Sequence, residues 1–305
     1  MDIKSFNTPI LLMGFNRPES IRKVLAEVRK ARPKQIFLAV DGPRTKEEEK
    51  KVKQVRDIAK EIDWPCKINT LFQKKNLGCR NGGITAIKWF FDNVEEGIIL
   101  EDDAIPTPDF FRFCAEMLEK YRHDNRIMHV SGCNFQRGWQ RERYSYYFSS
   151  YTYMWGFATW RRARKKYDPE AKLYPHLKSK GYIRDLFPNF FERKHMERIL
   201  NTAYYNNNDA PDTEWLYSVF INSGLSIVPN KNLINYIGFT EDSAHTKSED
   251  SFLYQPPSVI AFPLKHPPFI IKDIVADRRY VIWLLLNKIK KYLFFKTGIC
   301  KLFFK

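Results

Sequence analysis

Three consecutive carboxylates, Glu101-Asp102-Asp103, form the stretch of this sequence best suited to chemistry. They follow the apolar run Ile98-Ile99-Leu100, which is typical of a buried strand in a parallel sheet. Ligands of open α/β sheets bind outside the carboxyl ends of the strands, where these acids are expected. Adjacent anions repel one another unless they are solvated, cap a helix or share a cation. The triplet alone therefore leaves two interpretations open, a solvated loop with a cap for the helix near Thr107-Pro108-Asp109 and a metal site.

Two more acids, Asp212 and Glu214, stand close together in the segment 211–215. A carboxylate that takes a proton from a reacting hydroxyl typically accelerates a reaction by about 10²–10⁴-fold. Asp212 also begins a predicted helix, so a capping role fits it too.

The elements that must position these acids follow from the apolar pattern. Strands are predicted at 9–15, 35–40, 66–72 and 97–100, with helical segments at 18–28, 46–62 and 84–93 between them. This alternation predicts an α/β fold with a right-handed, mostly parallel central sheet flanked by helices. Polar residues that end three of the strands are then expected at one sheet edge: Asn16-Arg17, Asp41-Gly42 and Glu101-Asp102-Asp103.

The second half of the chain is less regular. Helices are expected at 110–121, 182–208 and 212–223, strands at 127–132 and 226–229, and an aromatic-rich stretch lies at 144–160. No domain boundary is visible before about residue 250. We therefore expect one domain over residues 1–250 and a C-terminal extension over 251–305.

Composition excludes several classes of protein. The 305 residues are 44% hydrophobic and 15% aromatic, which excludes a disordered chain. The five cysteines are scattered, which argues against a disulfide framework or a zinc site and for a reducing compartment. We find no secretory signal and no apolar run near the ~20 residues that span a membrane, so the expected location is cytoplasmic.

The positive charge is concentrated at the end of the chain. Of the net charge of +16, half comes from residues 278–305, which hold eight Lys or Arg and no acid among apolar residues at helical spacing. This pattern predicts a basic amphipathic segment on an anionic membrane surface, at the inner face of the cell membrane; packing against the body or a partner is the alternative. No motif that reads nucleic acid accompanies the charge, so nucleic acid is not an expected partner.

The order and spacing of seven short motifs resemble a known family. They are Asn16-Arg17-Pro18, Asp41-Gly42, Asn76-Leu77-Gly78, Glu101-Asp102-Asp103, Trp155-Gly156-Phe157, Asp212-Thr213-Glu214-Trp215 and His245. Together they resemble glycosyltransferases of the GT-A (nucleotide-diphospho-sugar transferase) fold. The similarity is to bacterial relatives of the alpha-mannoside beta-1,2-N-acetylglucosaminyltransferase, over residues 8–246.

This resemblance implies a metal and a donor site. Asp103 would bind a divalent cation, Mn²⁺ or Mg²⁺, and Glu101 and Asp102 would contact the ribose and sugar of a nucleotide-diphosphate sugar. His245 would return to the metal or the pyrophosphate, although a lone loop histidine is often only solvated. A divalent cation suits a donor whose pyrophosphate leaves with two negative charges.

Further donor contacts are implied for Arg17, Asp41 and Arg80. Arg17 would face the nucleotide or phosphate, with a solvated helix start as its alternative. Asp41 would face the base, with a turn-forming Asp-Gly as its alternative. Arg80 would add charge at a helix start, where a simple loop-to-helix turn is also expected. Gly156 and Phe157 would belong to a loop that closes over the donor sugar, or to an aromatic core.

For the base, the resemblance points to Asp212 before Glu214. The segment departs from the family in having Pro211 where an aromatic is usual and in adding Glu214, so both acids stay candidates. The resemblance thus implies a metal-dependent, inverting transfer of sugar from a nucleotide-diphosphate donor, with UDP as the nucleotide. The acceptor would be a glycan or lipid-linked saccharide, in bacterial surface-polysaccharide assembly. A non-catalytic sugar-nucleotide or membrane-surface binding protein and a sugar-phosphate nucleotidyltransferase are the alternatives.

Overall fold

The computed structural model describes residues 6–205, 209–238 and 254–297. Its central sheet has eight strands in the order β3-β2-β1-β4-β8-β6-β9-β7. Neighbours from β3 to β4 and the pair β6–β9 are parallel, whereas β8 is antiparallel to β4 and β6, and β7 is antiparallel to β9. The strands are β1 (Ile10–Gly14), β2 (Gln35–Val40), β3 (Lys67–Phe72), β4 (Glu96–Glu101), β6 (Ile127–Ser131), β7 (Tyr146–Ser149), β8 (Phe157–Trp160) and β9 (Leu225–Pro229).

Helices cover both faces of the parallel half of this sheet. On β1, Ile10 and Leu12 pack with α1, α2 and α4, whereas Leu11 between them packs with α3. Strands buried on both faces explain why these segments read as continuous apolar runs. The α/β class with a large central sheet is therefore confirmed. These helices are α1 (Pro18–Ala31), α2 (Lys46–Asp57) with the 3₁₀ turn Ile58–Glu61, α3 (Gly78–Asn93) and α4 (Pro108–Lys120).

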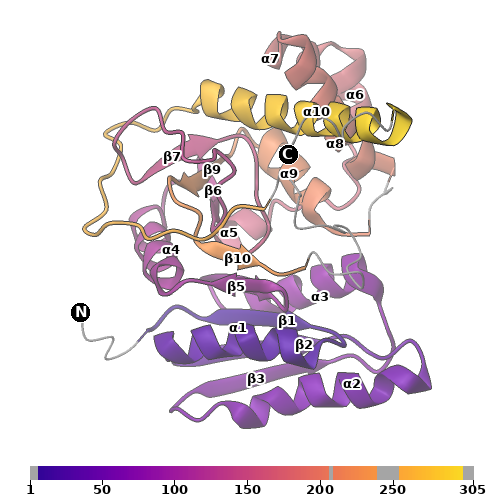
Figure 1. The fold of residues 1–305 in the computed structure, drawn as a ribbon, viewed down its shortest axis with the longest axis vertical. Coiled ribbons are helices and arrows are strands. Elements are labelled where there is room, and N and C mark those ends of the chain that lie inside the picture. Colours follow the sequence, from indigo (N-terminus) through magenta and orange to yellow (C-terminus); the bar gives the residue numbers. More distant parts are fainter. Residues whose placement is uncertain (1–5, 206–208, 239–253, 298–305) are drawn as a thin grey trace.

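In its described residues, the second half of the chain adds six helices and the strand that completes a small sheet. β5 (Ala104–Pro106) pairs antiparallel with β10 (Ile234–Tyr236), which returns the chain to the end of β4. Figure 1 shows α6–α8 and α10 gathered at the end of the molecule opposite β3 and α2. These helices are α5 (Arg161–Arg164), α6 (Tyr174–Ser179), α7 (Tyr182–Leu186), α8 (Phe190–Tyr205), α9 (Asp212–Ile221) and α10 (Ile274–Thr297).

Some predicted elements differ in their limits. The single helix expected at 182–208 is divided into α7 and α8 by Phe187-Pro188-Asn189, because proline disfavours the helical conformation of the residue before it. α3 begins at Gly78 rather than at residue 84, so it contains the pair Gly82-Gly83. The aromatic-rich stretch 144–160 supplies the strands β7 and β8.

The first turns of α10 pack on the body along one side. The first turn of α10 is fixed by Asp277, which accepts hydrogen bonds from Ser149 Oγ (2.5 Å) and the Ser150 amide (3.0 Å). Val281 is fully buried on the same helix. Among the helices that the structure describes, none is both long and apolar enough to cross a bilayer.

Candidate functional site

The site is built where β1 and β4 end side by side. The two strands are parallel, and Met13 lies opposite Glu101, so the residues after each strand leave the sheet at the same edge. Arg17, at the start of α1, places Nη1 2.9 Å from Asp103 Oδ2 and 3.4 Å from Asp102 Oδ1. The structure thus brings together Arg17 and the acidic triplet, as the sequence predicts.

Asp103 has one oxygen satisfied and one unsatisfied. Its Oδ2 accepts from Arg17, and the Tyr236 hydroxyl donates a second hydrogen bond to this carboxylate. Its Oδ1 is buried and has no hydrogen-bond partner among the described residues. The chain at Gly238 passes so close to this carboxylate that a Cβ there would lie 2.6 Å from Asp103 Oδ2. A buried carboxylate oxygen without a donor is a position that a cation fits.

Burial disfavours the charged form of all three acids. Burial, and then the charges of Asp103, Asp102 and Asp212, raise the pKa of Glu101. Burial and the charge of Asp103 likewise raise the pKa of Asp102, and burial raises that of Asp103. Asp102 and Asp103 are each only 8% exposed. Among the described residues, Arg17 is the positive charge that lowers these pKa values, so the three carboxylates need either protons or an additional cation to lie together.

The Trp155-Gly156-Phe157 segment lies against this site through its tryptophan. The Trp155 and Tyr236 rings stack at 4.0 Å and 6°, and Tyr236 in turn bonds Asp103. Gly156 has a φ of +63°, and a Cβ there would lie 2.5 Å from Ile234 Cδ1, which explains why glycine is required. The Phe157 side chain is 1% exposed and belongs to the core against α3, which is the alternative that the sequence left open.

Asp41 organises the loop before α3. Its carboxylate accepts hydrogen bonds from the amides of Gly42 (2.8 Å), Leu77 (3.0 Å) and Gly78 (3.1 Å). This arrangement is the turn-forming use of an Asp-Gly pair, and it ties the end of β2 to the start of α3. A contact of Asp41 with a nucleotide base stays a prediction.

Arg80 and Glu214 bind each other. Arg80 Nε lies 2.6 Å from Glu214 Oε1, and the glutamate side chain is fully buried. Thr213 Oγ1 donates to the other glutamate oxygen at 3.1 Å, and Arg80 also donates to the Pro169 carbonyl. Both groups therefore have internal partners that connect α3 with α9. This use competes with the phosphate contact predicted for Arg80 and with proton abstraction by Glu214.

Asp212 lies at the first position of α9, close enough to Glu101 to help raise the pKa of that carboxyl. The helix is anchored by Trp215, which is fully buried and donates from Nε1 to His129 Nδ1 at 3.1 Å. Since Nδ1 accepts, the His129 proton is on Nε2, 3.1 Å from the Tyr153 carbonyl. Burial lowers the pKa of His129 to about 3, which keeps the ring neutral. The buried Trp215–His129 pair thus holds Asp212 near the acidic triplet.

Three residues near the site were not identified from the sequence. Partial burial, and then Glu101, Asp212 and Asp103, raise the pKa of the Cys79 thiol to about 12. Tyr280, on α10, is near enough to Asp212 for that charge to raise its pKa further after burial. Tyr236 is the third. Isolated Cys and Tyr residues carry no spacing signal, so only the fold reveals that they lie here.

His245 lies outside the described residues. Among the described ranges, no group of three or more His, Cys, Asp or Glu side chains is arranged to hold a metal ion by itself. From the described residues, Asp103 would be the ligand of a cation here, alongside donor oxygens and water. This ligand set suits Mg²⁺ and Mn²⁺, which keep several non-protein oxygen ligands.

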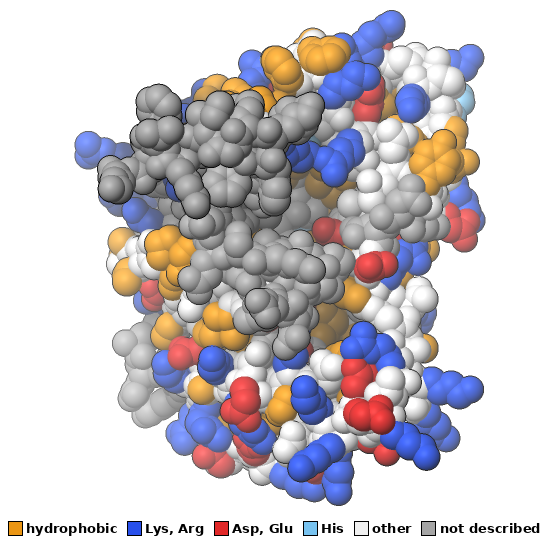
Figure 2. All heavy atoms as spheres, turned by 45° about the vertical axis from the view of Figure 1, so that its right-hand side comes forward, with side chains coloured by type: hydrophobic (Ala, Val, Ile, Leu, Met, Phe, Trp, Pro, Cys, Tyr) orange, Lys and Arg blue, Asp and Glu red, His pale blue; other side chains and the backbone are white. Residues whose placement is uncertain are grey.

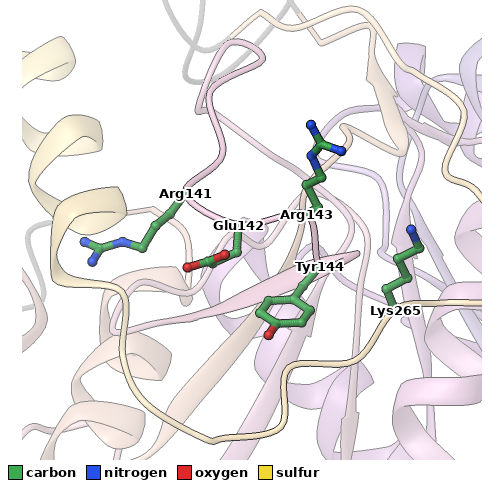
Figure 3. Close-up of a pocket in the computed structure, with 5 residues that line it drawn as sticks. All are labelled: Arg141, Glu142, Arg143, Tyr144 and Lys265. Atoms are coloured by element: carbon green, nitrogen blue, oxygen red, sulfur yellow. The ribbon is translucent and has the colours of Figure 1, made fainter.

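A separate hollow of about 510 Å³ shares no residue with this site. Figure 3 shows its five lining side chains pointing in different directions rather than toward a common centre. One of them, Arg141, pairs with Asp273 at 3.1 Å. We assign it no function. The lining residues are Arg141, Glu142, Arg143, Tyr144 and Lys265.

Comparison with known proteins gives distant likenesses to solved structures. No family model and no curated protein matches the sequence. Among solved structures, S. aureus TarS 1–349 is similar with 10% identity and a TM-score of 0.45; the match covers 76% of this chain and 61% of that one. UDP-glucose pyrophosphorylase complexed with UDP-glucose is similar with 10% identity and a TM-score of 0.37, over 73% and 90%. The synthase of 4-diphosphocytidyl-2C-methyl-D-erythritol from Anaerococcus prevotii gives 10% identity and a TM-score of 0.38, over 73% and 86%. Likenesses this distant do not indicate a shared reaction.

Proposed function

We propose that this protein is a metal-dependent, inverting glycosyltransferase of the GT-A type that uses a UDP-sugar. The observation that carries the proposal is the buried Asp103 Oδ1, which has no partner in the described part of the chain and lies beside two further carboxylates at a strand-end edge. Such an edge is where open α/β sheets bind their ligands. A bound Mn²⁺ or Mg²⁺ would stabilise the charge that develops on the leaving pyrophosphate.

Different residues of this chain would bind the cation, the phosphates and the sugar of the donor. Asp103 would hold the cation, with His245 as a further candidate, and Glu101 and Asp102 would position the ribose and sugar. Arg17 would turn from the carboxylates toward the donor phosphates, which offer it stronger charge complementarity. The Trp155–Tyr236 stack would provide an apolar wall for the sugar.

We assign proton removal from the acceptor hydroxyl to Asp212. Glu214 has its charge neutralised by Arg80 and is fully buried, whereas Asp212 lies at the helix start near Glu101. The acceptor is a glycan or a lipid-linked saccharide. The basic segment 278–305 would bring the enzyme to the anionic inner leaflet where a lipid-linked acceptor is presented.

The test is a thermal-shift screen of the full chain with nucleotide-diphosphate sugars, with and without Mn²⁺. We expect one donor to raise the melting temperature only when Mn²⁺ is present. Asp103→Asn should abolish this shift, and Asp212→Asn should keep it while turnover falls about 10²–10⁴-fold. The absence of a metal-dependent shift with every donor would refute the proposal.

A further inference from the structure

Large apolar side chains are exposed on α7 and on the start of α8. Tyr182, Leu186, Phe190 and Phe191 are 53–58% exposed, although they fall within ten residues of one another. We call these four residues the α7–α8 patch. A cluster of large exposed apolar groups on a folded protein marks a surface that binds something.

The patch is surrounded by positive charge. Residues 172–198 contain seven Lys or Arg and three acids, and one of the acids, Glu192, is neutralised by Arg278 at 3.0 Å. Arg193 and Lys194 approach the face of the Phe190 ring, at 5.8 and 5.9 Å from its centre. The cations therefore stand among the apolar groups rather than on a separate face.

The outer face of α10 also exposes large apolar side chains. Ile282, Leu286 and Ile289 are about half exposed and recur at spacings of four and three, which places them on one side of the helix. α10 is joined to α8 by the Arg278–Glu192 pair. Figure 1 shows these helices together at one end of the molecule, and Figure 2 shows basic and apolar side chains intermixed there.

We propose that this helical end docks on an anionic lipid bilayer, with the α7–α8 patch entering the interfacial region. Cores of protein–protein interfaces are depleted of lysine, whereas here lysines and arginines flank the exposed apolar groups. Basic side chains reach the headgroups while aromatic and aliphatic groups enter the acyl boundary. The α7–α8 patch is thus a second membrane contact, beside that of residues 278–305.

The experiment is co-sedimentation of the full chain with vesicles of phosphatidylcholine, with and without phosphatidylglycerol. We expect binding to the anionic vesicles and weak binding to the neutral ones. Phe190→Ser with Phe191→Ser should lower the partition coefficient about tenfold or more, because two large apolar groups no longer enter the interface. Lys180→Glu with Arg184→Glu should lower binding to the anionic vesicles only.

The matched control is Ile68→Ser with Phe72→Ser, which removes two exposed apolar groups from β3. β3 lies at the opposite end of the molecule from α7 (Figure 1), so this control should bind vesicles like the unmodified chain. Equal losses in control and patch variants, or no binding by the unmodified chain, would overturn the proposal. So would gel filtration showing that the patch joins two copies of the chain. No sugar nucleotide is used, so this result does not depend on that of the thermal-shift screen.

Discussion

The ion pair between Arg80 and Glu214 gives a sharp test of how α3 and α9 are joined. The Glu214 side chain is fully buried, and Arg80 Nε lies 2.6 Å from its Oε1. Arg80→Ala would leave a buried carboxylate that, within the described residues, keeps a side-chain hydrogen bond from Thr213 Oγ1. Breaking one partner of such a buried pair typically costs about 3–5 kcal/mol.

This cost converts into a measurable change in melting temperature. Unfolding entropy is about 2.1 cal/mol/K per residue, or about 0.6 kcal/mol/K for 305 residues. We therefore expect Arg80→Ala to lower the melting temperature by about 5–8 °C in differential scanning calorimetry. Adding Glu214→Met to Arg80→Ala should recover much of the loss, because no unpaired buried charge then remains.

The matched control lies on the same helix. Lys88 and Asp92 on α3 form a surface pair at 2.7 Å, with side chains 73% and 58% exposed. Lys88→Ala should cost less than about 0.5 kcal/mol, which is below 1 °C. Two results would contradict this dependence of Glu214 on Arg80. One is a fall in melting temperature for Arg80→Ala no larger than that for Lys88→Ala. The other is a further fall when Glu214→Met is added to Arg80→Ala.

Three further outcomes are expected. Glu214→Gln should keep turnover within about tenfold of the unmodified enzyme, whereas Asp212→Asn should lose more. Steady-state kinetics measures both turnover numbers, and a larger loss for Glu214→Gln than for Asp212→Asn would make Glu214 the base. His129→Phe leaves the buried Trp215 N–H without an acceptor and should cost about 1–3 kcal/mol in urea unfolding, whereas an unchanged midpoint would contradict that anchor. Burial raises the pKa of Asp277 to about 6, so the folded chain binds this proton more tightly than the unfolded chain, whose value is about 3.9. Stability is therefore lost as pH rises from about 4 to 6. Between pH 5 and 7, the unfolding free energy of Asp277→Asn should fall by about 1 kcal/mol less than that of the unmodified chain. Parallel profiles of unfolding free energy against pH for the two proteins would contradict this role of Asp277.

The parallel half of the fold was predictable because both faces of each strand are buried. β1, β2 and β4 are continuous apolar runs with polar residues at their ends, and the spacing of α1 matches its buried stripe. β7 and β8 were not predicted, because aromatic residues suit a strand, a core loop or a ligand wall equally well. The small β5–β10 sheet was missed because three-residue strands carry no period.

Within the site, the acids at strand ends were easier to predict than the residues that contact the site's acids in the folded chain. The neighbourhood of Arg17 and Asp103 follows from adjacent parallel strands, so a local pattern was sufficient. The Arg80–Glu214 pair joins residues 134 positions apart, and no pattern in the sequence indicates it. Tyr236 and Cys79 are isolated polar residues, and only the path of the chain brings them to the carboxylates.

The packing of α10 changes how the role of the C-terminal segment has to be tested. Its inner side holds Asp277, Tyr280 and Val281 against the body, and Tyr280 also lies near Asp212. A chain ending at residue 277 would lose Tyr280 and Val281, so its failure to bind vesicles or to turn over substrate would reflect lost packing as much as lost membrane contact. Substitutions confined to the outer face, such as Ile282→Ser with Leu286→Ser, leave the inner side intact. Only such variants separate attachment to a surface from the assembly of the site.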